Sequence, residues 1–422
     1  MIQDCYELRV GRIVGYLAKE KLSFWILLVY FIFEYLRPQS MYPAIDIIPW
    51  GKVIIIALSA VFFLEGNTFN VKNVENRFLI IYFIIVILSS MGAISSTESW
   101  SKLSVIIIYV WMYFLIVNLV NTEKRLFLFT LFFLLLNFKL AFFVGRQWVG
   151  RGFEYDKFGA VAGQGWLENP GEFGLEMVIF FSISIYFFLS VYKDINSIKK
   201  FILLLFPLSA LASIIASNSR GSILAGGTVL LMIWVRGRKK LTGIILLFII
   251  CVGFFLTAPE EVLDRFQNMG EQTDSTAMNR VERWGRGLEM AKINPILGVG
   301  YGNWEIADKT YFNGTGALSH NIFIDCASEL GYLGLIIFLL MILYTFVNNA
   351  KTRKLAKADL NEGRFIYNMA KGLDFALVGF LVGGFFVSVL YYPYFWVNMT
   401  MTVSLNNVAR IKYGEDGQRR KV

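Results

Sequence analysis

Long apolar runs alternate with short polar segments along most of the chain. Because about 20 apolar residues cross a bilayer as one helix, each run of that length predicts a transmembrane span. Such runs lie near 22–37, 51–65, 77–94, 102–120, 126–145, 172–192, 200–216, 221–236, 241–257, 321–348, 373–390 and 392–410. The pattern predicts an all-α integral membrane protein with about 12 transmembrane helices. We expect one polytopic domain over residues 1–422.

Composition and charge agree with that interpretation. Hydrophobic residues make up 56% of the chain and charged residues only 17%, whereas a soluble domain is about half apolar and a quarter charged. A net charge of +9 is also typical of nucleic-acid-binding proteins, but here the basic residues lie in short loops between apolar runs. The positive-inside rule explains them better. We therefore expect no nucleic-acid partner, and both chain termini on the cytoplasmic side.

The longest polar segment, residues 258–320, is expected to form a large loop on the opposite, outer face. Within it, residues 279–293 have the period of an amphipathic helix, with Val281, Trp284 and Leu288 on one face. The glycines that follow this helix allow the backbone to approach a ligand closely. Any chemistry of the protein is expected to centre on this segment.

The positive-inside rule does not explain the basic residues of the outer face. Eight of these residues are arginines: Arg37, Arg146, Arg151, Arg220, Arg265, Arg280, Arg283 and Arg286. The planar guanidinium group suits bidentate binding of phosphate oxygens, so the set indicates an anionic ligand. Lipid headgroup contacts, or loop ion pairs with carboxylates such as Glu34 and Glu282, are the alternative. Arg220 is the strongest candidate, because the short link SNSRGS holds its charge near the hydrocarbon boundary, where charges are costly.

The only histidine, His320, directly precedes the tenth predicted span, with Ser319 as the expected N-cap. Asn321, Asp325 and Glu329 follow at intervals of four and form one polar face of that span. Carboxylates inside a span usually face the bundle interior or a watery cavity. A lone histidine is more often structural, but one beside many arginines is a candidate to move a proton near neutral pH.

A second outer loop, residues 145–171, is rich in glycine and aromatic residues and ends at Asn169-Pro170, a helix-start signal. Its aromatic side chains either stack on sugar rings or form an interfacial belt; they are Trp148, Phe153, Tyr155 and Trp166. Glu172 follows the loop and is expected to hold arginines in place or to orient a polar acceptor.

Four short sequence motifs follow one another between residues 219 and 334. They are Ser219-Arg220-Gly221; Arg280-x-x-x-Trp284; Asn294-Pro295-x-x-Gly298-x-Gly300-x-Gly302-Asn303; and His320-Asn321 followed by Glu329-x-Gly331-x-x-Gly334. In these motifs the chain resembles the O-antigen ligase and O-antigen polymerase-related superfamily of bacterial envelope glycosyltransferases, also called Wzy_C. The resemblance implies a GT-C-like helical fold in the bacterial inner membrane, with a large periplasmic loop late in the chain. Members often have an Asp-x-Asn motif before the sixth span. At that place this chain has Glu168-Asn169-Pro170.

The resemblance also implies a reaction. Such proteins pass a glycan from undecaprenyl diphosphate to an acceptor hydroxyl without a metal or other cofactor, and an O-antigen ligase uses a lipid A-core sugar as the acceptor in lipopolysaccharide biosynthesis. Carried over by position, Arg220 and Arg280 would hold the diphosphate and His320 would act on the acceptor hydroxyl. The weaker candidates for the diphosphate are Arg146, Arg151, Arg265, Arg283 and Arg286, and the supporting residues are Asn321, Asp325, Glu329, Glu172 and Arg37.

Three other functions stay open on the sequence. Two are an O-antigen polymerase and a protein O-oligosaccharyltransferase, which differ from a ligase only in the acceptor. The third is a transporter of an anionic lipid or solute, which the one-sided basic residues and the 63-residue segment 258–320 argue against. No His or Cys cluster predicts a zinc site, and Mg²⁺ held by carboxylates is the remaining metal alternative.

Overall fold

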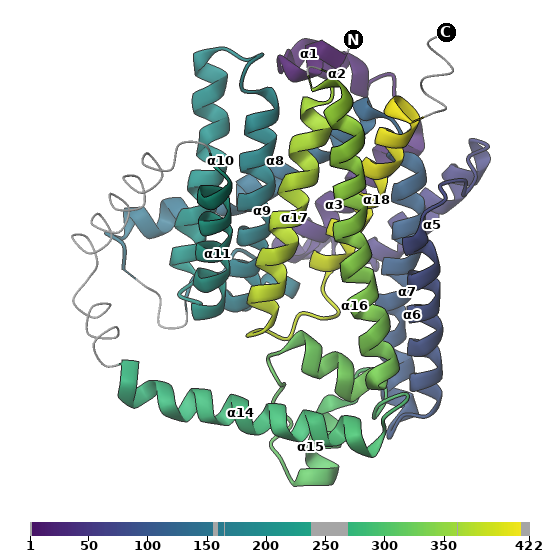
Figure 1. Cartoon of the computed structure of the whole chain (residues 1–422), viewed down its shortest axis with the longest axis vertical. Coiled ribbons are helices and arrows are strands. Elements are labelled where there is room, and N and C mark those ends of the chain that lie inside the picture. Colours follow the sequence, from purple (N-terminus) through teal and green to yellow (C-terminus); the bar gives the residue numbers. More distant parts are fainter. Residues whose placement is uncertain (1, 155–158, 164, 238–268, 361, 415–422) are drawn as a thin grey trace.

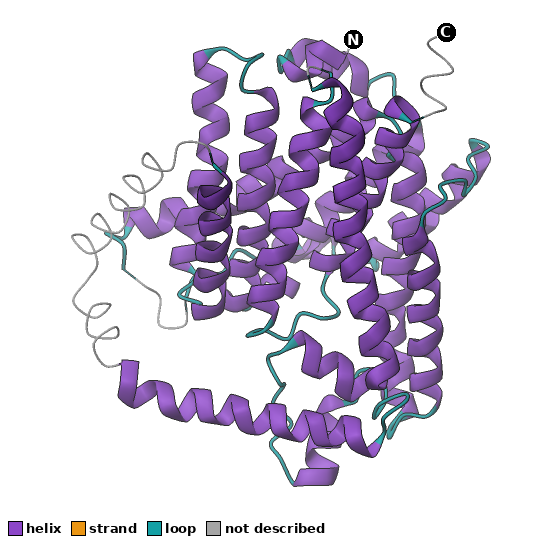
Figure 2. Ribbon diagram, in the orientation of Figure 1, coloured by secondary structure: helices purple, strands orange, loops and turns teal. Residues whose placement is uncertain are grey.

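The computed structural model describes residues 2–154, 159–163, 165–237, 269–360 and 362–414. All regular secondary structure in these ranges is helical (Figure 2). The long bundle helices are α3 (Leu22–Tyr35), α5 (Trp50–Leu64), α6 (Val74–Met91), α7 (Ser96–Leu119), α8 (Glu123–Gly150), α9 (Pro170–Val191), α10 (Ser197–Ala216), α11 (Arg220–Arg236), α16 (Ile322–Ala356), α17 (Arg364–Gly384) and α18 (Pro393–Tyr413). The remaining elements are α1 (Ile2–Tyr6), α2 (Val10–Leu17), α4 (Pro38–Met41), α14 (Met269–Ile293), α15 (Trp304–Phe312) and the 3-10 turns η1 (Pro43–Ile45), η2 (Gly165–Leu167) and η3 (Lys357–Asp359).

The helices confirm the prediction of an all-α membrane protein. Every predicted span overlaps one long helix, except 241–257, which lies outside the described residues. Among the described helices, seven are long and apolar enough to cross a membrane, and α3 and α5 are shorter apolar helices. The chain is a multi-pass membrane protein.

Helix α9 forms the centre of the bundle and packs against α17, α10 and α11. Small residues allow its close approach to α17, because the space beside Gly379 is filled by Val178 and that beside Gly372 by Tyr186. The Ser182 hydroxyl donates a 2.8 Å hydrogen bond to the Gly372 carbonyl across the same interface. At the start of α9 the Asn169 side chain accepts a 2.9 Å hydrogen bond from the Gly171 N–H, which confirms the predicted helix start.

The two helices of the segment after residue 268 form a separate layer across one end of the bundle. Figure 1 shows α14 and α15 at that end, while α1 and the C-terminal end of α18 lie at the other end. The chain therefore places the segment of the predicted large loop opposite its termini, as an even number of spans requires.

The predicted apolar face of α14 is only partly the face that packs. Val281 and Leu288 are exposed, at 58% and 43%, and α14 instead buries Met290 and Ala291 against the bundle side. Gly287 explains this rotation, because a Cβ there would lie 2.4 Å from Ile324 and 2.7 Å from the Trp304 ring. Gly287 of α14 therefore faces Trp304, because a larger side chain would not fit there.

Helix α16 is interrupted at Gly331, which has φ +69° and ψ −177°. The interruption frees carbonyl groups, and the glycine-rich loop after α14 uses them: the Val299 N–H donates to Ser328 O at 2.8 Å and the Gly300 N–H to Glu329 O at 3.2 Å. A Cβ on Gly331 would lie 2.4 Å from the Ile296 carbonyl oxygen. Gly298 also packs closely against α16, whereas an added Cβ on Gly300 would meet Ala93 and one on Gly302 would meet Lys102.

Candidate active site at the end of the bundle

His320 lies in the turn that leads into α16. Its φ of +57° is a left-handed conformation that is uncommon outside glycine. The His320 N–H donates a 2.9 Å hydrogen bond to the Ser388 hydroxyl, in the linker between α17 and α18. This bond ties the turn to the neighbouring linker and so restrains the direction of the imidazole.

The N-cap of α16 is Asn321, so the expectation that Ser319 caps the helix is wrong. Asn321 Oδ1 accepts hydrogen bonds from the Phe323 and Ile324 N–H groups, at 2.9 and 3.3 Å. The Ser319 hydroxyl lies against the Asp325 carboxylate instead. The residues on both sides of His320 are thus engaged with α16, and His320 itself is partly buried.

Helix α14 holds this turn from the other side. Trp284 Nε1 donates a 3.0 Å hydrogen bond to the Ser319 carbonyl, and Arg283 donates one of 3.4 Å to the Leu318 carbonyl. The Trp284 ring also packs edge-on against Phe385, with 5.3 Å between the ring centroids. Through the motif Arg280-x-x-x-Trp284, α14 therefore packs beside the turn that contains His320.

Arg280 lies within electrostatic range of Arg220, Arg283 and the His320 imidazole, and these four residues form a cluster. Burial and the charges of Arg280 and Arg283 lower the pKa of His320 to about 4. Burial and the charges of Arg220 and Arg283 lower the pKa of Arg280, although a guanidinium group stays protonated at neutral pH. Within the described residues, no carboxylate lies within ion-pair distance of Arg220 or Arg280. Among the described residues, the cluster thus concentrates positive charge beside His320 with no carboxylate paired to Arg220 or Arg280.

The three carboxylates named as supporting residues hold the framework of this site. Asp325 accepts from the Ser319 hydroxyl. Glu329 accepts from the Trp304 N–H at 3.1 Å and from the Tyr391 hydroxyl at 2.7 Å. Glu172 accepts from the Tyr392 hydroxyl at 3.0 Å. They connect α9, α16 and α15 to one another and to the linker after α17.

Arg286 does not face the cluster. It pairs with Asp308 at 3.0 Å and with Glu282 at 2.6 Å, so the alternative of an intramolecular ion pair holds for this residue. Three residues turn a helix by about 300°, and Arg286 is therefore turned by about 120° from Arg280. We leave it out of the candidate diphosphate site.

The other arginines of the set lie apart from His320 or outside the described chain. Arg146 is exposed near the end of α8, and Arg151 caps that end. Arg265 lies outside the described residues. Arg37 lines a cavity on the other side of the linker after α17.

Residues 201–339 match a family model described as O-antigen ligase. This segment contains Arg220, Arg280 and His320. This segment of the chain belongs to the O-antigen ligase superfamily. Members of this superfamily are glycosyltransferase-like membrane enzymes that handle polysaccharides.

A curated relative in the superfamily is the exopolysaccharide production protein ExoQ of Rhizobium meliloti strain 1021. It is 31% identical over 88 residues, which cover 18% of this chain and 20% of the relative. The chain thus spans about a fifth of the length of the curated relative it matches.

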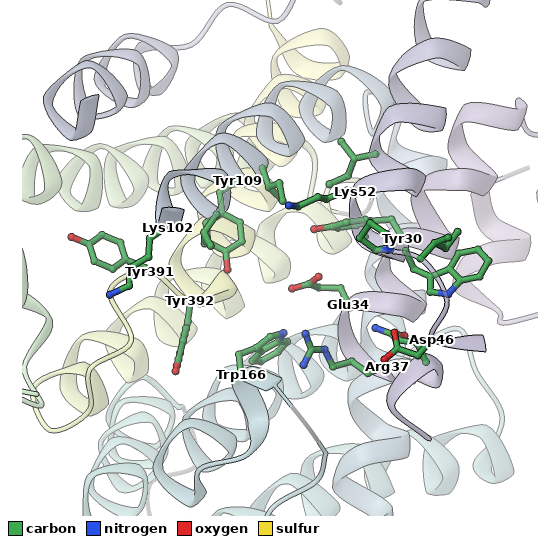
Figure 3. Close-up of a pocket in the computed structure, with 18 of the residues that line it drawn as sticks. Tyr30, Glu34, Arg37, Asp46, Lys52, Lys102, Tyr109, Trp166, Tyr391 and Tyr392 are labelled. Carbon is green, nitrogen blue, oxygen red and sulfur yellow. The ribbon is translucent and has the colours of Figure 1, made fainter. Parts of the chain in front are cut away.

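A cavity of about 570 Å³ is lined in part by Tyr391 and Tyr392, from the same linker as Ser388 (Figure 3). Its walls come from α3, the start of α5 and the segment before it, α7, η2, the glycine-rich loop after α14 and the linker after α17. They include Tyr30, Glu34, Trp50, Lys102, Tyr109, Trp166, Tyr301, Tyr391 and Tyr392. Nearly all of them lie outside the matched segment 201–339. Sequence reasoning missed most of these residues. Two signals were available: Trp166 was a candidate to stack on a sugar ring, and the spacing of Glu34 and Arg37 suggested an ion pair.

Candidate metal ligands do not gather in the described part of this ligase-superfamily chain. No group of three His, Cys, Asp or Glu side chains is close enough together there to hold an ion. The carboxylates nearest His320 and the linker accept hydrogen bonds from hydroxyl and amide groups of the chain.

Proposed function

We propose that this protein transfers a glycan from undecaprenyl diphosphate to an acceptor hydroxyl, as an O-antigen ligase that uses a lipid A-core sugar in lipopolysaccharide biosynthesis. The site would lie on the periplasmic side of the bacterial inner membrane, with both termini cytoplasmic. The observation that supports the proposal is that Arg280 of α14 lies within electrostatic range both of Arg220, at the start of α11, and of His320, before α16.

The positive cluster suits a diphosphate leaving group. Arg220 and Arg280 would bind its oxygens, with Arg283 nearby, and would stabilise the charge that grows on it as the sugar–phosphate bond breaks. Preorganised charges do this most effectively in a partly dehydrated site, because little reorganisation is needed during the reaction.

His320 would be the general base. The acceptor oxygen attacks the anomeric carbon, its proton passes to the neutral imidazole, and the anomeric C–O bond to the diphosphate breaks with its electron pair on the departing oxygen. Attack opposite the leaving group inverts the anomeric centre. No metal is needed in this scheme, because the guanidinium groups carry the counter-charge. The GT-C-like character of the fold is part of the same proposal.

The test is transfer by the purified protein in detergent, with lipid-linked glycan and separate lipid A-core and peptide acceptors. His320→Ala is expected to lower kcat by about 10²–10⁴-fold, and Arg220→Gln or Arg280→Gln by about 10²-fold. His320→Ala at near-normal rate would refute the base role. Lys309→Gln, a change to an exposed ion pair with Glu305, is the control.

An O-antigen polymerase is the second candidate, and the relative named for exopolysaccharide production favours it. In a deletion strain, long glycan left on undecaprenyl lipid favours a ligase, whereas single repeat units on that lipid favour a polymerase. Transfer to the peptide acceptor would indicate a protein O-oligosaccharyltransferase. Absence of any transfer in detergent, with transport in vesicles, would indicate a transporter.

A further inference from the structure

The cavity of Figure 3 has the size and lining of a ligand site. Its volume of about 570 Å³ lies within the roughly 300–1,000 Å³ range of small-molecule pockets. Aromatic rings from three separate regions face it, including Tyr109, Trp166 and Tyr392 (Figure 3). Charged groups of both signs, Glu34 and Arg37 among them, point into the same space.

Several polar atoms at this cavity are left without a partner in the described chain. Arg37 Nε and Gln39 Oε1 are buried and make no hydrogen bond, and both residues line the cavity. The Glu34 carboxylate lies beside the side chains of Trp166, Tyr30 and Arg37. Buried polar groups in native proteins are almost always paired, so these unpaired groups indicate that a polar ligand completes the site.

The mixture of aromatic and charged side chains in this cavity favours some classes of ligand over others. Rings without nearby charges would suit an acyl chain, and arginines alone would suit a phosphate. Here aromatic faces alternate with donors and acceptors, which matches a molecule with apolar C–H faces and a rim of hydroxyl groups. Tyrosine and tryptophan offer such a molecule a flat surface and a polar edge, while a carboxylate and a guanidinium group form strong hydrogen bonds with hydroxyls.

The linker between α17 and α18 connects this cavity to the turn that carries His320. Its residue Ser388 holds His320, and its residues Tyr391 and Tyr392 line the cavity. Ser388 and Tyr392 are four positions apart in the chain, so their Cα atoms are at most about 14 Å apart. A short oligosaccharide held in the cavity can therefore reach the imidazole with one of its hydroxyls or with its anomeric carbon.

We propose that this cavity binds a sugar residue of a glycan substrate and selects which glycan the protein accepts. The proposal rests on the proposed glycan transfer. The sugar can belong to the acceptor or to the glycan of the lipid-linked donor, since both present the same chemistry. Its position largely outside the matched segment 201–339 suits a specificity site, because the cluster for the diphosphate lies inside that segment.

The kinetic test uses Trp166→Ala and Glu34→Gln in the full-length protein, in detergent, with donor and acceptor varied separately. We expect the KM of one glycan substrate to rise at least tenfold while kcat stays within twofold. A rise for the acceptor assigns the cavity to the acceptor, and a rise for the donor assigns it to the donor glycan. Unchanged KM values for both substrates overturn the proposal. The controls are Trp25→Ala, at the other end of α3, and Glu289→Gln, in an exposed ion pair.

A binding test separates this proposal from the proposed reaction. Free oligosaccharides, released by mild acid from the surface polysaccharide of the source bacterium, are titrated against the purified protein while tryptophan fluorescence is recorded. Saturable binding that Glu34→Gln weakens at least fivefold supports the sugar site, even if wild-type protein transfers nothing and the proposed reaction fails. Equal binding by wild type and Glu34→Gln, or no binding by either, overturns the sugar site even if transfer is observed.

Discussion

The backbone N–H of His320 and the hydroxyl of Ser388 are joined by a 2.9 Å hydrogen bond, although 68 positions separate them in the chain. The bond joins the turn before α16 to the linker after α17. It restrains a residue with φ +57°, which would relax toward a more common conformation without it.

Ser388→Ala removes this hydrogen bond without introducing bulk. One hydrogen bond contributes about 1 kcal/mol, so we expect kcat to fall roughly five- to tenfold with KM nearly unchanged. The measurement is steady-state transfer in detergent. Ser209→Ala, which removes a hydroxyl bonded only within its own helix, is the control, and an equal loss in both variants would contradict a positioning role for Ser388.

The pH dependence of transfer should report the imidazole. In the free protein the pKa of His320 is lowered to about 4 by burial and by Arg280 and Arg283. The neutral form is the base, so kcat/KM should fall as the pH drops through about 4. Bound diphosphate adds negative charge beside the same ring and raises the pKa of His320. We therefore expect kcat to fall at a higher pH than kcat/KM.

The measurement is a pair of pH–rate profiles, with recovery of activity at pH 7 to exclude irreversible unfolding. A kcat profile that falls at the same pH as kcat/KM, or at a lower one, would show that no anion binds next to His320. For the His320→Gln variant, the pH profile of the residual transfer rate should show no fall at acidic pH that is due to His320.

The hydrophobic pattern was sufficient to predict the helices, because their long apolar runs leave no other structure in a bilayer. It also placed Arg220, Arg280 and His320 on one face, since the parity of the spans determines the side of each loop. The rotation of α14 was not predictable, because it depends on Gly287 meeting Trp304, a contact between two elements.

The cavity is a second feature beyond sequence reasoning. Its walls combine Tyr30, Tyr109, Trp166 and Tyr392 from four segments, each of which alone is indistinguishable from an interfacial aromatic residue. Only their packing reveals that they face the same space. Similarly, Glu34 and Arg37 have the spacing of an ion pair along a helix, but Arg37 lies beyond the end of α3 with φ +48° and no ion pair joins them.

Arg280 and Arg286 should behave in opposite ways when changed to glutamine. Arg286 bonds to Asp308, which is almost fully buried, and to Glu282. Losing it leaves a buried carboxylate without its partner, so the protein should be destabilised by about 1–3 kcal/mol. Donor affinity should be unchanged. Arg280 has no carboxylate partner among the described residues, so Arg280→Gln should weaken donor binding with little change in Tm.

Thermal unfolding and the affinity for lipid-linked glycan, measured on both variants, check this contrast. Weaker donor binding in Arg286→Gln, with unchanged Tm, would return Arg286 to the diphosphate site and contradict the role given to its ion pairs.

The break in α16 provides the most direct test of the fold around the site. At Gly331 an added Cβ would lie 2.4 Å from the Ile296 carbonyl oxygen, in a backbone conformation with φ +69° that L-residues rarely adopt. Gly331→Ala must therefore shift the glycine-rich loop, and with it the bond from Trp304 to Glu329. We expect a loss of stability of roughly 2–4 kcal/mol, read as a large drop in Tm or in folded yield.

Gly227→Ala is the matched control for Gly331→Ala. Gly227 lies inside α11 with no atom within 4 Å of an added Cβ, and alanine in a helix interior is favoured over glycine by about 0.5–1 kcal/mol. Its Tm should stay equal or rise slightly. If Gly331→Ala were as stable as Gly227→Ala, α16 could continue through residue 331 as a regular helix, and the carbonyls of Ser328 and Glu329 would no longer be available to anchor the loop beside the candidate active site.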